Sequence, residues 1–265
     1  MRTRSRSRPP SDLPAGSPVD VGHALPIAQN PIAFLVDGDN ASFELVGEML
    51  AEASKYGAVV IRRVYGDWSS TRMTGWRKGL AEHALVPIQQ FPNISRKNAT
   101  DSAMIIDAMD ILHSEVVKGF CIVSSDSDYT RLATRVREAG LLVMGIGEAK
   151  TPEAFRRSCH VFVLTENLEP PETPASPATH RQQPRNPRDA LQILRRAFDN
   201  VAGDEDRVHL GALADALRKL DSAFDPRTYG KSKLVDLMLA LPDTFAVERP
   251  HKPGIGAVYV RRKGA

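Results

Sequence analysis

The sequence holds few cysteines, little net charge and no long hydrophobic run. Its 265 residues include two cysteines, Cys121 and Cys159, and both lie in apolar surroundings. Such thiols are typical of buried side chains in a reducing compartment, which argues against a disulfide scaffold. No apolar segment approaches the length of a membrane span, and no signal-peptide pattern follows Met1. We therefore expect a cytoplasmic protein with no membrane partner.

Positive and negative charges are nearly balanced, since 35 Lys and Arg residues face 32 Asp and Glu residues for a net charge of +3. That excess is too small to identify a nucleic-acid partner by itself. In residues 1–28, Arg2, Arg4, Arg6 and Arg8 alternate with Ser and Thr before a stretch of Pro, Gly and Ser. This composition predicts a disordered tail, which either solubilises the chain or binds polyanions weakly.

Short apolar segments alternate with helical patterns from residue 29 to residue 168, a span that suits one domain. We expect strands at 32–36, 58–65, 85–91, 120–124, 141–146 and 161–164. Helices are expected between them, at 43–56, 76–84, 101–113, 129–139 and 152–158. Continuously apolar strands that alternate with helices predict an α/β fold, with a parallel sheet covered on both faces.

A second, smaller domain is expected at residues 187–263, after a Pro-rich linker at 169–186. We expect helices at 188–199, 208–220 and 232–241, followed by short strands at 245–247 and 258–260. This order of elements predicts a small helical domain with a β wing.

Acidic side chains gather where the predicted strands end. Asp37 and Asn40 follow the first strand, Asp126 and Asp128 follow the fourth, and Asp101 begins a helix on its apolar face. Ligands bind at this carboxyl edge of open α/β sheets. Crowded carboxylates repel one another unless a cation or a proton intervenes. Each motif alone could simply cap a helix, whereas the three together favour a metal site.

The chemistry of these ligands favours Mg²⁺ or Mn²⁺ over zinc, because they are hard oxygen donors with no histidine nearby. Such an ion activates a water and stabilises charge on an attacked phosphate. Ser124 and Ser125 lack a neighbouring histidine base, so we exclude them as nucleophiles. A phosphatase of the haloacid dehalogenase type would need Thr or Val in place of Asn40, and a lysine motif that we cannot place.

Two groups of side chains in the first domain could contact a nucleic acid. Trp76 lies among arginines and a lysine, which is the pattern of a base-stacking platform, although such a tryptophan is often simply packed. Arg96 and Lys97 lie just before Asp101, where a phosphate would approach the cleft.

In the second domain, basic side chains lie around the start of the last predicted helix. Arg227, Lys231 and Lys233 could bind phosphate there together with backbone N–H groups. Tyr229 lies among them, either as part of the RNA-binding surface or as a core residue.

Three ordered motifs, at 34–40, 97–101 and 123–129, resemble those of the NYN domain of the bacterial LabA-like kind. The resemblance covers about residues 31–168 and implies a PIN-like nuclease fold and a ribonuclease that uses Mg²⁺ or Mn²⁺. It also implies that Asn40 orients the phosphate or a water, and that the metal ligands are Asp37, Asp101, Asp126 and Asp128. Ser125 stands where the family often has glycine.

The run Phe224–Leu234 resembles the LOTUS domain, also called OST-HTH. This resemblance covers about residues 187–262 and implies a winged helix that binds RNA or a protein partner. The combined hypothesis is a ribonuclease that cuts RNA internally and carries an appended RNA-binding domain. The alternative is an RNA-binding adaptor that keeps the nuclease fold without cleaving.

Overall fold

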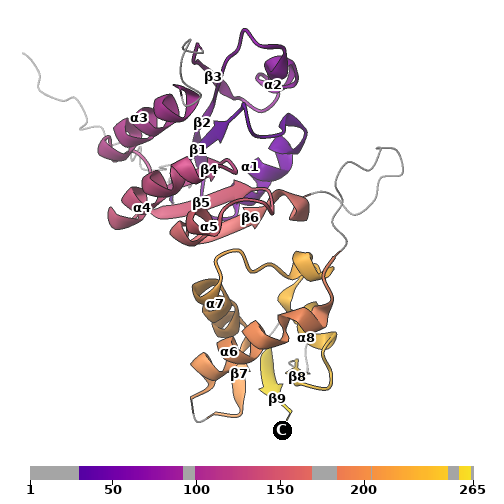
Figure 1. The fold of residues 1–265 in the computed structure, drawn as a ribbon. Coiled ribbons are helices and arrows are strands. Elements are labelled where there is room, and N and C mark those ends of the chain that lie inside the picture. The colour runs from indigo at the N-terminus through magenta and orange to yellow at the C-terminus, as the bar shows by residue number, and fades with distance from the viewer. Residues whose placement is uncertain (1–29, 92–98, 169–183, 204, 250–256, 264–265) are drawn as a thin grey trace, which may run out of the picture.

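The computed structural model describes residues 30–91, 99–168, 184–203, 205–249 and 257–263. The predicted basic tail and most of the predicted linker lie outside these ranges. Six parallel strands form one sheet in the order β3-β2-β1-β4-β5-β6 (Figure 1). The strands are β1 (Ile32–Asp37), β2 (Val59–Gly66), β3 (Val86–Gln89), β4 (Gly119–Val123), β5 (Leu142–Gly147) and β6 (Val161–Leu164). The predicted PIN-like parallel sheet is confirmed.

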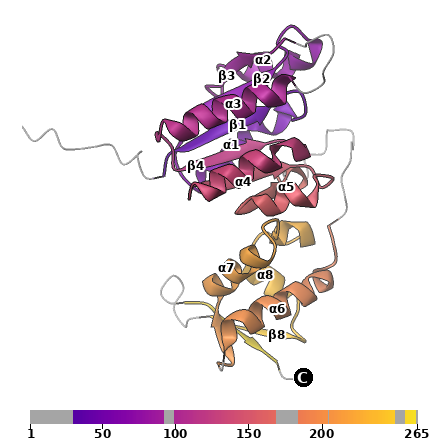
Figure 2. The ribbon, with the colours of Figure 1, turned by 60° about the vertical axis from the view of Figure 1, so that its left-hand side comes forward.

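Helices cover both faces of this sheet. They are α1 (Val46–Ser54), α2 (Thr74–Gly79), α3 (Ala99–His113), α4 (Thr130–Glu138) and α5 (Glu153–Ser158). Successive side chains of a strand point to opposite faces, so β1 contributes to two cores. Ala33 and Leu35 pack toward α3, α4 and α5, whereas Phe34 and Val36 pack toward α1 and α2 (Figure 2). Fully burying one Leu or Phe side chain contributes about 1.5–3 kcal/mol, so this central strand is held firmly.

The strand order reverses between β1 and β4. From β1 the chain proceeds outward to β2 and β3, and from β4 it proceeds outward in the other direction to β5 and β6. Strands that diverge in this way leave a crevice at their carboxyl ends. Asp37 ends β1 and Val123 ends β4, so the acidic motifs flank this switch point.

The C-terminal region is a small bundle of helices with an antiparallel sheet in the order β7-β9-β8. Its elements are α6 (Leu191–Ala202), β7 (Arg207–His209), α7 (Leu210–Leu220), α8 (Leu234–Leu239), β8 (Phe245–Glu248) and β9 (Tyr259–Arg262). Leu213, Leu217 and Val260 are fully buried in a core of its own. The helices and the β wing expected from the sequence are both present.

Several predicted helix bounds differ from the structure, and α2 (Thr74–Gly79), for example, ends well before the predicted end of the helix at 76–84. Val208 was expected in a helix but lies in β7, where it pairs with Val260 of β9. The predicted helix at 43–56 begins instead with a 3-10 turn at Phe43–Leu45, and the Ser42 side chain makes no capping hydrogen bond.

The C-terminal region contacts the edge of the large sheet through the segment that follows α7 (Figure 1). The backbone N–H of Phe162 in β6 donates to the carbonyl oxygen of Ser222 at 2.8 Å, and the Ser222 hydroxyl donates to the carbonyl oxygen of Arg156 at 2.8 Å. Nη1 of Arg227 lies 3.1 Å from Oε2 of Glu52. These contacts cover part of an edge strand that would otherwise present unpaired backbone groups.

Both cysteines are buried and unpaired, as the sequence indicated. Within the described ranges, no helix combines the length and the apolar character needed to span a lipid bilayer.

Candidate metal centre

Asp37 is fully buried at the carboxyl end of the central strand. Its Oδ2 accepts two hydrogen bonds, from Nδ2 of Asn40 at 2.8 Å and from the Ser124 hydroxyl at 3.0 Å. Its Oδ1 is also buried and has no hydrogen-bond partner among the described residues. A buried carboxylate oxygen without a donor is costly unless a proton or a cation meets it.

Burial raises the pKa of Asp37 from 3.8 to about 6. The hydrogen bonds from Asn40 and Ser124 lower it, and the nearby charges of Asp101 and Asp39 raise it by smaller amounts. Desolvation therefore dominates at this site. Near neutral pH the carboxylate carries a charge that its surroundings only partly stabilise.

Three further carboxylates form a compact group beside Asp37. One ligand oxygen from each of Asp101, Asp126 and Asp128 lies within 4.8 Å of the other two. Asp101 comes from the first turn of α3, and the other two come from the loop after β4. Burial raises the pKa of Asp101, and the charges of Asp126 and Asp128 raise it further. The structure thus brings together three of the four predicted metal ligands, with Asp37 next to them but outside this tight group.

Two residues hold these acids in place. The hydroxyl of Tyr129, which is fully buried, donates to Oδ1 of Asp101 at 2.8 Å. The Ser124 hydroxyl, besides donating to Asp37, accepts from the backbone N–H of Asp126 at 3.1 Å. Ser124 therefore connects the carboxylate that ends β1 to the loop that follows β4. Neither of these positioning contacts is predicted from the sequence, because Ser124 is weighed there only as a nucleophile and Tyr129 is assigned no role.

The loop after β4 owes its shape to Asp126 itself. Its Oδ1 accepts from the backbone N–H of Asp128 at 3.0 Å, which caps a 3-10 turn at Ser127–Tyr129. Aspartate is a preferred residue at such a cap. A serine two residues before this aspartate is the one local signal that could have indicated the Ser124 contact.

The residues present fit a hard divalent cation. The candidate metal ligands among the described residues are all carboxylate oxygens, which Mg²⁺ and Mn²⁺ prefer. Four aspartates supply them at one edge of the sheet. The unpartnered Oδ1 of Asp37 is the kind of atom that a cation, or a water bound to one, would satisfy.

One predicted RNA contact is corrected by the structure. Trp76 is 1 % exposed, and its ring packs edge-on against Phe43 at a centroid distance of 5.6 Å. A side chain buried in this way has no free face on which a base could stack, so we remove Trp76 from the RNA-binding set. Arg96 and Lys97 lie outside the described residues.

The predicted basic residues of the C-terminal region have different surroundings. Arg227 is paired with Asp225 and with Glu52 of α1, so its guanidinium faces the large sheet domain. Tyr229 is partly buried, with its ring 5.9 Å from that of Phe224. Lys233 is exposed and Lys231 is partly so. Whether these side chains bind RNA stays a prediction.

A basic groove lies between the large sheet and the C-terminal region. Its volume is about 1030 Å³, and its lining includes Arg137, Arg156, Arg157, Arg196, Arg218 and Lys219. Glu153, Asp215 and Asp221 are the acidic residues that line it. Nε of Arg156 is buried with no hydrogen-bond partner in the described structure. A polyanion would find a net positive surface here.

Two family models match the two parts of the chain. A family model described as the NYN domain matches residues 31–166, and one described as the OST-HTH/LOTUS domain matches residues 183–256. A protein of unknown function from Vibrio parahaemolyticus, solved as a crystal structure, is 19% identical, with a TM-score of 0.43 over 52% of this chain and 93% of that one. An uncharacterized protein from Nitrosomonas europaea, solved by NMR, is 30% identical, with a TM-score of 0.26 over 37% of this chain and 90% of that one. No curated protein matches.

Proposed function

The chain belongs to the NYN domain family, and from this premise we propose that it is a metal-dependent ribonuclease that hydrolyses RNA phosphodiester bonds. The observation that carries the proposal is the acidic centre. One oxygen from each of three carboxylates lies within 4.8 Å of the other two, next to a fourth carboxylate with a buried oxygen that has no partner among the described residues. Such a concentration of negative charge favours a divalent cation and opposes an RNA phosphate unless that cation is present.

The proposed roles follow from the contacts of each side chain. Asp101, Asp126 and Asp128 would hold a Mg²⁺ or Mn²⁺ ion, and Asp37 would offer its Oδ1, which has no partner among the described residues, to the ion or to a water. Asn40 and Ser124 fix the Asp37 carboxylate by donating to its other oxygen. When bound, the ion would supply an activated water and would stabilise the charge that develops on the phosphate.

The C-terminal region would supply RNA binding, because it matches the OST-HTH/LOTUS model. The basic groove beside it offers phosphate contacts from both parts of the chain. This arrangement supports a substrate that spans both regions.

The test is cleavage of a labelled RNA panel by the full chain in Mg²⁺, in Mn²⁺ and in EDTA. We expect cleavage with either metal and none in EDTA, and internal products if the enzyme is an endonuclease. Asp126→Asn should abolish cleavage, because it replaces an anionic ligand with a neutral one of similar shape. Asp110→Asn, an exposed change on α3, is the matched control and should cleave as the wild type does.

Tight RNA binding without cleavage in any metal would contradict the ribonuclease proposal. It would favour the alternative of a non-catalytic adaptor. Cleavage that survives Asp126→Asn and Asp37→Asn would support the ribonuclease activity. It would show that these two residues are not the ones on which the activity depends.

A further inference from the structure

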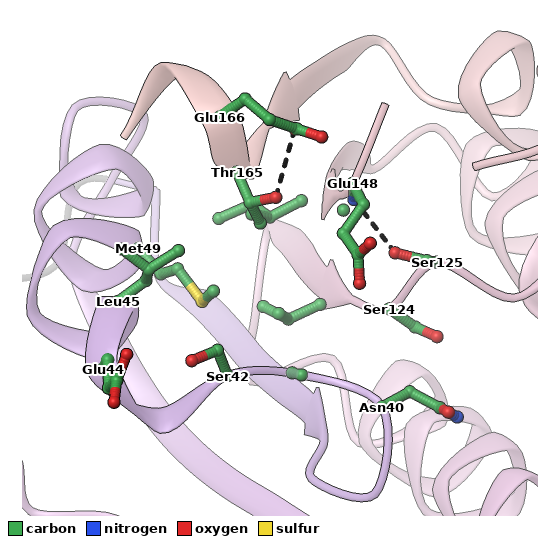
Figure 3. A pocket seen from close by; sticks show the side chains of 14 residues that line it. Asn40, Ser42, Glu44, Leu45, Met49, Ser124, Ser125, Glu148, Thr165 and Glu166 are labelled. Atoms are coloured by element: carbon green, nitrogen blue, oxygen red, sulfur yellow. Dashed lines mark hydrogen bonds between the residues drawn. The ribbon is translucent and has the colours of Figure 1, made fainter. Parts of the chain in front are cut away.

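A cavity of about 310 Å³ lies beside the acidic centre at the carboxyl ends of β1, β4, β5 and β6 (Figure 3). It lies on the side of Asn40 and Ser124 that faces α1, and the metal-ligand candidates do not line it. Its position at the sheet edge makes it accessible to a substrate that is bound at the acidic centre. None of the roles proposed above uses it.

The lining of this cavity has an unusual balance of chemistry. Its floor is apolar and includes Leu45, Met49, Val123 and Ile146. Its polar wall consists of hydroxyls, the carboxamide of Asn40 and three carboxylates, from Glu44, Glu148 and Glu166, and its lining includes no lysine, arginine or histidine. A phosphate would be repelled here, whereas a flat, neutral group with hydrogen-bond donors would fit both the floor and the wall.

The polar wall is held in place by its own hydrogen bonds. The backbone N–H of Glu148 donates to the Ser125 hydroxyl at 2.9 Å, and Oε1 of Glu166 accepts from the backbone N–H of Ala149 at 2.8 Å (Figure 3 shows the first). The Thr165 hydroxyl donates to Oε2 of Glu166 at 3.2 Å. Because the Glu166 carboxylate is fixed before any ligand arrives, contacts with this part of the wall cost little side-chain freedom.

A second hollow of about 390 Å³ joins this cavity to the acidic centre. It shares Asn40, Ser125 and Glu148 with the cavity, and it extends to Asp126 and Lys150. Lys150 lies 2.9 Å from the Glu148 carboxylate, and it is the one cation along this path. A polymer could therefore place a phosphate near Asp126 and Lys150 and a neighbouring group in the cavity.

We propose that the cavity binds the nucleobase next to the scissile phosphate, and that it favours bases that carry an exocyclic amino group. This proposal rests on the proposed ribonuclease function. Adenine, cytosine and guanine can donate an amino hydrogen to a carboxylate, in the way that Glu accepts from cytosine. Uracil carries a carbonyl oxygen where cytosine carries its amino group, so an acceptor would face the carboxylate at that position, and the single N3–H is the donor that uracil has left on this edge. The Met49 thioether adds a soft contact for the face of the ring.

Glu44 is the best residue for a test, because it is exposed at the rim and no described contact engages its carboxylate. Glu44→Gln keeps the size of the side chain and removes the charge, and the new amide can donate to uracil. Glu48→Gln, one turn along in α1, makes the same change outside the cavity lining and is the matched control.

The experiment measures binding of short A-rich, C-rich and U-rich RNAs to the full chain carrying Asp126→Asn in Mg²⁺, so that RNA stays intact. The proposal expects A-rich and C-rich RNAs to bind about tenfold more tightly than U-rich RNA, which is the effect of one good hydrogen bond to a charged group. Adding Glu44→Gln should reduce that preference to about threefold or less, and adding Glu48→Gln should leave it unchanged. In wild type, mapped cleavage sites should show the same order of bases.

Equal binding of the three RNAs, or a preference that Glu44→Gln leaves intact, would overturn the proposal. So would binding of the polyamine spermine that Glu44→Gln abolishes while the RNA preference stays, because the carboxylates would then serve a cation. Base preference in binding without any cleavage would keep the cavity and refute the ribonuclease. Cleavage without a base preference would keep the ribonuclease and refute the proposed role of the cavity.

Discussion

The burial of the Asp37 carboxylate lowers the stability of the folded chain when this group is charged. The side chain is fully buried, and its pKa is raised from 3.8 to about 6 because burial disfavours the charged form. A raised folded-state pKa means that the stability which the neutral group contributes is fully present below about pH 4 and is lost as the pH rises through 6. In the metal-free protein, neutral pH should therefore weaken the fold.

We predict that Asp37→Asn stabilises the metal-free protein at pH 7.5 but not at pH 3.5. The shift of about two pKa units corresponds to roughly 3 kcal/mol, because each unit equals about 1.4 kcal/mol. Urea unfolding in EDTA at the two pH values measures the difference. Asn can still accept from Asn40 and Ser124, so the packing should survive. A variant that is equally stabilised, or equally destabilised, at both pH values would show that ionisation of Asp37 is not the cause.

A divalent cation should reverse this effect, because it binds the folded chain and not the unfolded one. At about one hundred times its dissociation constant, an ion adds roughly 2.7 kcal/mol, which raises the melting temperature by about 5 °C for a chain of this size. We expect Mg²⁺ or Mn²⁺ to produce such a shift in wild type and in Asp110→Asn, and to produce little in the double variant Asp126→Asn/Asp128→Asn. The same shift in all three proteins would place the ion elsewhere.

The position of a site residue could be predicted from the sequence only where neighbouring residues in the chain determine it. Asp37 and Asp126 could be placed because the first ends an apolar strand and the second lies shortly after one, and parallel strands bring such ends together. Whether Trp76 faced solvent or the core was not predictable, because its neighbour Phe43 lies in another element. The contact of Ser124 with Asp37 and that of Tyr129 with Asp101 join distant segments, so no spacing indicates these two.

Elements of the large sheet were predicted well for a physical reason. A strand buried on both faces is apolar at every position, and helices between such strands are bounded by turn residues. Gly140, for example, ends the segment of α4 with a φ of +79°, which favours glycine. β7 was missed because its assignment depends on pairing with β9, about fifty residues further along the chain.

The carboxyl end of β5 must approach β4 closely, and Gly147 allows it. A Cβ at this position would lie 2.5 Å from the backbone carbonyl oxygen of Ser124 and 2.8 Å from the Thr151 hydroxyl. Since backbone cannot yield as a side chain can, Gly147→Ala should displace the end of β4, which carries Ser124 and leads to Asp126.

We therefore predict that Gly147→Ala lowers stability by about 1–3 kcal/mol and weakens metal binding, although it changes no ligand. Denaturant unfolding gives the first effect, and titration with Mn²⁺ gives the second. Gly140→Ala, which has no atom within 4 Å of its Cβ but a strained φ, is the control: it should lower stability and leave metal affinity as it is. Unaltered metal affinity in Gly147→Ala would show that the acidic loop does not depend on this contact.

At the scale of the whole molecule, the run Phe224–Leu234 has more than the expected role. It was assigned to RNA binding from its resemblance to the LOTUS domain, but in the structure Arg227 pairs with Glu52 of the large sheet domain. Asn167 also donates to the Thr228 hydroxyl at 3.1 Å across the same junction. The two regions are thus in contact, and that contact creates the basic groove, which no local pattern in either region could indicate.

RNA phosphates could bind in this groove or at Lys231 and Lys233, the basic residues found from the sequence, and single substitutions distinguish the two. Arg196 on α6 lines the groove, whereas its neighbour Arg195 is equally charged and exposed but does not line it. Arg196→Gln should weaken binding of single-stranded RNA and reduce the slope of log affinity against log salt by about 0.7, which is the contribution of one phosphate contact. Arg195→Gln should change neither. Fluorescence anisotropy across a salt series measures both quantities.

The double variant Lys231→Gln/Lys233→Gln separates the two sites. If phosphates follow the groove alone, this variant should resemble Arg195→Gln, whereas a slope reduced by about 1.4 would indicate that RNA also contacts the start of α8. Equal losses for Arg195 and Arg196 would mean that RNA responds only to net charge and that the groove has no special role. Because a change in slope counts contacts, this measurement distinguishes a defined RNA path from general attraction to a basic surface.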